Sequence, residues 1–214
     1  MAAQFPHSED ADPACGFTIG LALLDASTGK LGAALLHLAD DLEEALGVYE
    51  RTFAPQQPDG IAQARDIRVQ RIVPPIPSAA ESTGPEEAAR IAGAFPGHVR
   101  PLYALAVTDA YACTPAEHAL MRLTASCREA GVPWGGGLAC GGGSLIEPCA
   151  RGPRMGRMRR TRSERIDQLI AAIRSRRAVN DMIDGPASGI LLAPCPLPAP
   201  LYPLATNFYE RHCP

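Results

Sequence analysis

This chain of 214 residues lacks several features that would assign it to a class at once. It contains no apolar run that approaches the roughly 20 residues needed to cross a bilayer. Its first residues, Met1–Asp12, are polar and acidic, unlike a secretory signal. None of its seven cysteines is paired at the two-residue spacing of a zinc or iron–sulfur ligand set. We therefore expect a reduced, cytoplasmic protein without a membrane span.

Familiar catalytic motifs are missing as well. The five histidines show no metal-ligand spacing. The run Gly141–Ser144 is not the Gly-x-Ser-x-Gly of a nucleophile elbow. Lys30 does not belong to a triphosphate-binding loop, because Leu31 stands where a serine or threonine would hold Mg²⁺. We predict no metal site, and no residue is assigned as catalytic acid, base or nucleophile.

The overall charge gives no sign of a nucleic-acid partner. The net charge is −3 and the isoelectric point is about 6.0. One local exception is a cluster of arginines between Arg151 and Arg165. Such a cluster suits a nucleotide phosphate, a partner's acidic patch or RNA, and a solvated loop is the simpler interpretation. No aromatic side chains are interleaved with the arginines, which argues against single-stranded nucleic acid.

The stretch Leu102–Ile146 predicts one complete βαβ unit. Leu102–Val107 is an apolar run of strand length, and Gly135–Ile146 supplies a second strand interrupted by three glycines. Between them, Thr114-Pro115-Ala116-Glu117 has the pattern of a capping box, which predicts a helix with Thr114 as its N-cap. Three consecutive glycines allow a backbone to approach a flat or bulky group closely.

A second strand–turn–helix unit lies nearer the N-terminus. Phe17–Leu24 is a continuous apolar run, typical of a central parallel strand that is covered on both faces. The polar turn Asp25–Lys30 leads into a helix whose leucines recur every three or four residues. These leucines are Leu31, Leu35, Leu38, Leu42 and Leu46.

The remaining segments have weaker patterns. Val48–Phe53 is a candidate edge strand, and Ile67–Val73 has β-type residues but arginines that suit a central strand badly. Capping boxes predict a short helix over Thr83–Phe95 and another that begins at Thr161–Glu164. Gly189–Leu192 is either a short last strand or an apolar connection.

Alternating strands and helices predict a doubly wound α/β fold with a parallel sheet. Residues 1–16 are expected to form a flexible leader and residues 17–193 a single domain. Residues 194–214 form a tail rich in proline and aromatic residues, which we expect to pack on the domain.

The segment Val107–Ile146 resembles the second half of the flavodoxin-like NAD(P)H-dependent oxidoreductases of the FMN reductase type. Gly137–Gly143 matches their Gly-x-x-x-Gly-x-Gly strand end, the tail Pro196–Asn207 is similar to their proline-rich C-terminal segment, and Asp25–Lys30 resembles their phosphate-binding turn. The resemblance implies a three-layer α/β/α sandwich with strand order 2-1-3-4-5. It also implies FMN as cofactor, NAD(P)H as co-substrate, a small-molecule or quinone acceptor, and a homodimer that completes the flavin site.

Two groups of residues are predicted to hold the cofactor. The hydroxyls of Ser27 and Thr28, the amides of Gly29 and Lys30 and the helix N-terminus are hydrogen-bond donors suited to a phosphate, although an ordinary helix cap explains them equally well. The resemblance places the flavin ring against three loops. The residues of these loops are Pro75, Ile76, Thr108, Asp109, Ala110, Tyr111, Gly141, Gly142 and Gly143.

Some residues depart from the family pattern and support an alternative. Ala110 and Cys113 stand where a glycine and an acidic residue are expected, and Pro74–Pro77 only partly matches the third-strand loop. Tyr111 is suited either to stack on a flavin or to cap the core, and Cys113 is either a reactive thiol at a helix N-terminus or a silent one. The alternative function is a degenerate flavodoxin-like scaffold without flavin, which acts by binding a partner protein.

Overall fold

The computed structural model describes residues 17–27, 30–53, 67–72 and 101–212, and all structural statements concern these ranges. Several predictions lie outside them. These are the leader 1–16, the helix over Thr83–Phe95 and the site residues Thr28, Gly29, Pro75 and Ile76.

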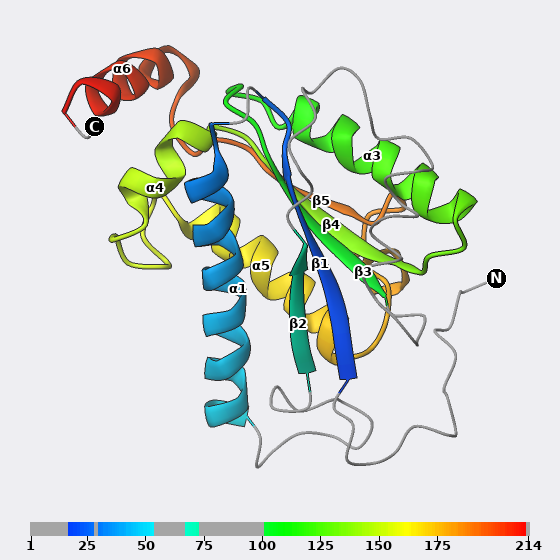
Figure 1. The fold of residues 1–214 in the computed structure, drawn as a ribbon. Helices are drawn as coiled ribbons and strands as arrows, with labels where there is room; N and C mark the ends of the chain where they lie inside the picture. The colour runs from blue at the N-terminus through cyan, green and yellow to red at the C-terminus, as the bar shows by residue number, and fades with distance from the viewer. Residues whose placement is uncertain (1–16, 28–29, 54–66, 73–100, 213–214) are drawn as a thin grey trace.

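The core of the domain is a sheet of five parallel strands in the order β2-β1-β3-β4-β5 (Figure 1). The strands are β1 (Phe17–Asp25), β2 (Ile67–Ile72), β3 (Leu102–Val107), β4 (Trp134–Cys140) and β5 (Ile190–Ala193). Every residue of β3 is buried, as expected for a central parallel strand. The order 2-1-3-4-5 is that of the flavodoxin-like fold, so the predicted fold class is confirmed.

Helices cover both faces of this sheet. Helices α1 (Gly32–Phe53) and α5 (Arg160–Arg174) pack together on one face, and α3 (Thr114–Glu129) packs on the other (Figure 1). The leucines predicted to form one side of the first helix are all buried. None of the helices among the described residues is long and apolar enough to cross a membrane.

Short elements make up the remainder of the described chain. The turn after β4 forms a 3₁₀ helix η3 (Gly143–Leu145) and a short helix α4 (Ile146–Cys149). A second 3₁₀ helix, η4 (Val179–Asp181), precedes β5. The tail contains η5 (Ala199–Leu201) and α6 (Tyr202–His212), and much of α6 extends away from the three layers (Figure 1).

The structure corrects the bounds or type of two predicted strands. Val48–Phe53 is not an edge strand but the last part of α1, where Tyr49 still packs against the core and lies under the Arg174 guanidinium. Strand β4 ends at Cys140, because Gly142 adopts a left-handed conformation (φ 68°) that breaks the extended backbone. The predicted strand therefore does not continue to Ile146.

The predicted helix caps are also wrong. Cys113, not Thr114, is the N-cap of α3, and Arg159, not Thr161, is the N-cap of α5. Neither N-cap makes a side-chain capping bond. In α3 the amide of Glu117 donates to the carbonyl of Cys113, so the helix begins one residue earlier than the capping box predicts.

Strand β2 shows how arginines fit into a sheet at its edge. Arg71 donates hydrogen bonds of 2.7 Å to Asp40 and Glu43 of α1. An edge strand leaves its side chains room to reach solvent and neighbouring helices, which a central strand does not. The segment is therefore a strand despite its charges, and it ends at Ile72.

The close contact between β4 and the fully buried Tyr103 gives a stability prediction. A Cβ atom at Gly135 would lie 2.5 Å from the Tyr103 ring, whose hydroxyl donates to the carbonyl of Arg177 at 3.0 Å. Gly135→Ala should therefore lower the free energy of unfolding by about 1–3 kcal/mol or more through overpacking, measured by urea denaturation.

The matched control is Gly47→Ala in α1, where the nearest atom to a new Cβ is the end of the Arg51 side chain at 3.7 Å. This substitution should be neutral or stabilise by up to about 1 kcal/mol, because alanine favours helix more than glycine. Equal effects of the two substitutions would contradict the packing argument.

Candidate functional site

The carboxyl ends of the parallel strands meet at one edge of the sheet, where ligands bind in open α/β folds. Backbone hydrogen bonds join the three loops at this edge. The amide of Ala26 donates to Val107 at 2.8 Å, and the amides of Gly142 and Gly143 donate to Ala110 and Thr108 at 2.8 and 2.9 Å. The described members of the predicted site therefore do come together in space.

At the β1–α1 turn, the carboxylate of Asp25 accepts from the Ser27 hydroxyl, which was one of the donors predicted for a phosphate, and from two backbone amides. Its Oδ1 accepts from the amide and hydroxyl of Ser27 at 2.9 and 2.7 Å, and its Oδ2 accepts from the amide of Leu31 at 2.8 Å. Lys30 is exposed beside this turn. A negative group at a helix N-terminus is electrostatically favourable, so Asp25 acts as a cap for α1.

The described part of this turn does not fit an FMN phosphate as it stands. A phosphate would have to displace the Asp25 carboxylate from the donors of Ser27 and Leu31, and the two negative groups would repel each other at short range. The structure thus favours the helix-cap interpretation of the turn. The signal in the sequence was the spacing of Asp25 and Ser27, which is that of an Asx turn.

The three glycines after β4 are in close contact with other parts of the chain. A Cβ at Gly141 would lie 2.6 Å from the carbonyl oxygen of Tyr111, and one at Gly143 would lie 2.6 Å from Leu31. A Cβ at Gly142 would lie 2.9 Å from the sulfur of Cys195. The space that these glycines leave beside the backbone is therefore filled by the protein's own atoms.

Hydrogen bonds from two tyrosines join the C-terminal tail and the β3–α3 loop. The Tyr111 hydroxyl donates to the carbonyl of Leu197 at 2.9 Å, and the Tyr202 hydroxyl donates to the carbonyl of Asp109. Their rings meet edge to face with centroids 5.8 Å apart. Tyr202 thus packs against Tyr111, a contact that local sequence patterns do not reveal.

The other polar groups of this loop are also engaged within the chain. Asp109 accepts a hydrogen bond from the Ser144 hydroxyl at 2.6 Å, and the Thr108 hydroxyl oxygen accepts from the amide of Ala110 at 3.2 Å. Ser144 was not predicted to belong to the site. Its role depends on the turn of the chain after the glycines, which brings it back to the end of β3.

Two cysteines at this edge, Cys113 and Cys140, are not activated nucleophiles. Burial raises the pKa of Cys113, and the nearby Glu117 carboxylate raises it further. Burial raises the pKa of Cys140 to about 12. Both thiols are therefore protonated at neutral pH, and the interpretation of Cys113 as a reactive thiol is not supported. Among the described residues, no group of three or more His, Cys, Asp and Glu side chains could hold a metal ion.

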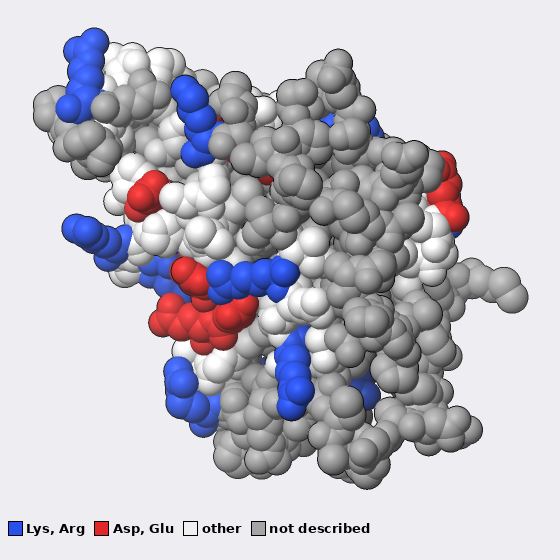
Figure 2. Space-filling view, viewed as in Figure 1, with Lys and Arg blue, Asp and Glu red and all other residues white. Residues whose placement is uncertain are grey.

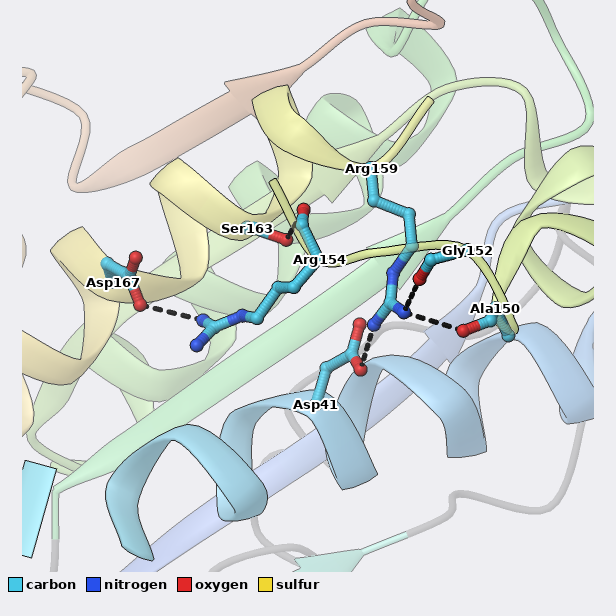
Figure 3. Close-up of polar contacts among 7 residues, drawn as sticks. All are labelled: Asp41, Ala150, Gly152, Arg154, Arg159, Ser163 and Asp167. Atoms are coloured by element: carbon cyan, nitrogen blue, oxygen red, sulfur yellow. Dashed lines mark hydrogen bonds and ion pairs between the residues drawn. The ribbon is translucent and has the colours of Figure 1, made fainter. Parts of the chain in front are cut away.

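Much of the arginine cluster is used to hold the structure together (Figure 3). Arg159 donates to Asp41 of α1 at 2.5 Å and to the carbonyls of Ala150 and Gly152, both at 2.6 Å. Arg154 pairs with Asp167 of α5 at 2.7 Å. These contacts fix the loop between α4 and α5 against α1 and α5. This part of the cluster is therefore not a solvated loop.

Acidic and basic side chains also alternate on the surface around α1 and β2. Figure 2 shows acidic and basic side chains beside one another on this face. Among the described residues, Arg71 pairs with Asp40 and Glu43. In such pairs the opposite charges offset each other locally.

The sheet order and the two helical layers define a flavodoxin-like α/β domain. Comparisons of the chain with models of known protein families, with curated proteins and with solved structures found no match. The topology alone therefore carries the assignment of the fold.

The role of Asp25 as an internal cap can be tested by stability. Asp25→Ala leaves the amides of Ser27 and Leu31 without their acceptor, so the free energy of unfolding should fall by about 1–3 kcal/mol. Asp184→Ala removes an exposed carboxylate and should change it by less than about 0.5 kcal/mol. Urea denaturation of both variants gives the comparison, and an Asp25→Ala protein as stable as wild type would refute the capping role.

Proposed function

We propose that this protein is a flavodoxin-like scaffold that works by binding another protein chain and does not use flavin. The observation that carries this proposal is the Asp25 carboxylate, which accepts hydrogen bonds from Ser27 and Leu31 at the end of the turn that would hold a phosphate. A site built for an anionic cofactor offers free donors, whereas here a fixed negative charge is bound to them.

The ring side of the site supports the same proposal. The flavin would lie against Thr108–Tyr111 and Gly141–Gly143, and these two segments contact each other and the tail. Tyr111, the aromatic residue predicted for flavin stacking, already packs against Tyr202 of the tail. FMN binding, with NAD(P)H as the electron donor, stays a prediction from the sequence that a direct titration decides.

For the partner, we propose a second copy of the chain that contacts η5 and α6. Leu201, Leu204 and Phe208 follow one another at spacings of three and four residues and are 48%, 66% and 55% exposed. Residues at this spacing lie on one side of a helical segment and suit packing against another helix. In a two-fold symmetric dimer, the apolar side of this segment in one copy would pack against the same side in the other copy, because such an interface is self-complementary.

The absence of flavin chemistry is tested by the visible absorbance of the purified protein and by fluorescence titration with FMN. We expect no flavin spectrum and no saturable binding up to about 50 µM FMN. Riboflavin serves as the matched ligand because it lacks the phosphate. Saturable binding of FMN that is tighter than that of riboflavin, followed by NADH or NADPH oxidation with a quinone, would overturn the proposal.

Self-association through α6 is tested by light scattering after size-exclusion chromatography. A charge at Leu204 would have to be buried in the interface, so Leu204→Glu should shift a dimer to monomer, with a loss of affinity of tenfold or more. Met121→Glu on α3 is the control, since Met121 is 52% exposed on another helix. A monomeric wild type, or equal dissociation by both variants, would contradict this arrangement.

A further inference from the structure

One arginine of the cluster differs from its neighbours. Arg162 lies in the first turn of α5 and is only 5% exposed. Arg154, Arg159 and Arg160 pair with Asp167, Asp41 and Glu164 respectively. No hydrogen bond or ion pair joins the Arg162 side chain to any residue in the described ranges.

None of the ion pairs found among the described residues involves Arg162. Its positive charge acts on the thiols of Cys140 and Cys149 and lowers their pKa, against the larger effect of burial. The guanidinium therefore lies near the carboxyl end of β4 and near α4, among protonated thiols. A guanidinium that is buried without a partner is strongly unfavourable, so this position calls for an anion.

Arg162 as a residue keeps a small exposed fraction of 5%. Within the described residues, the fully buried side-chain nitrogens without a partner belong to Trp134, Arg154 and Arg174. The nitrogens of Arg162 are not among these atoms.

The N-terminus of α5 provides further donors at the same place. This helix has 15 residues, no acidic residue in its first turn and no side-chain cap. The amides of Thr161 and Arg162 donate to no acceptor in the described chain, whereas those of Arg160 and Ser163 do. Side chains in a helix point back toward its N-terminus, so the Arg162 guanidinium and these amides face the same region.

We propose that Arg162 and the first turn of α5 form a binding site for a small phosphate-type oxyanion, either free or as the phosphate of a small molecule. The helix dipole and the free amides favour negative charge at this end. The planar guanidinium adds a two-pronged contact of the kind that arginine makes with phosphate oxygens. The site is distinct from the β1–α1 turn, and it does not depend on the partner-binding function proposed above.

The site is tested by titrating inorganic phosphate into the full chain and following thermal unfolding, with sodium chloride added to keep the ionic strength constant. We expect the midpoint temperature of wild type to rise with phosphate, because the ligand binds only the folded state. Acetate at matched ionic strength distinguishes a phosphate site from a general carboxylate site and should have a smaller effect.

Three variants locate the effect. Arg162→Met keeps the length of the side chain without its charge and should weaken phosphate binding at least tenfold. Its unliganded stability should equal or exceed that of wild type, because a buried unpaired charge is removed. Arg162→Lys keeps the charge but not the planar guanidinium, and should bind phosphate more weakly than wild type. Arg157→Met removes an exposed arginine of the same cluster and should leave binding unchanged.

Two results would overturn the proposal. One is a wild-type midpoint that phosphate moves no more than matched sodium chloride does. The other is a phosphate effect that survives in both Arg162 variants or is lost equally in Arg157→Met. If Arg162→Met does not fold, the phosphate titrations of wild type and of Arg162→Lys still test the proposal.

Discussion

The parallel pairing of β1 with β3 at the centre of the sheet is the constraint on which the rest of the structure depends. The two strands pair from Gly20 with Leu102 to Asp25 with Val107, and all of these residues except Asp25 are buried. A pair of strands that is apolar on both sides must be covered twice, which requires helices in two layers. Because the strands are parallel, their polar loops all emerge at the same edge.

At that edge the polar groups need hydrogen-bond partners, and in this protein many of them bond to one another. Asp25 binds its own turn, Asp109 accepts from Ser144, and Tyr202 donates to the Asp109 backbone. Buried polar groups are costly without partners, so a network satisfied from within is stable but has less to offer a ligand. This balance is the physical argument on which the proposed binding scaffold rests.

The arginines of the cluster between Arg151 and Arg165 differ from one another in whether they have partners. Arg159 joins the loop after α4 to Asp41 of α1, and so helps to set α5 against its neighbour. Arg162, three residues later and turned inward, has no such partner in the described chain. Residues of one type in one short segment thus have different roles, which burial and the positions of the carboxylates determine.

The sequence alone determined the elements whose signal is periodic and local. The leucine spacing of α1, the apolar run of β3 and the alternation of strands with helices were enough to predict a doubly wound parallel α/β fold. The resemblance to flavodoxin-like oxidoreductases supplied the strand order. Helix starts were less certain, because Thr114 and Thr161 have capping sequences while the backbone places Cys113 and Arg159 in that position. Only the tertiary structure decided which polar groups meet. Tyr202 lies 93 residues from Asp109, and Arg159 lies 118 residues from Asp41. Contacts at such separations depend on how the layers pack, and no local pattern encodes them.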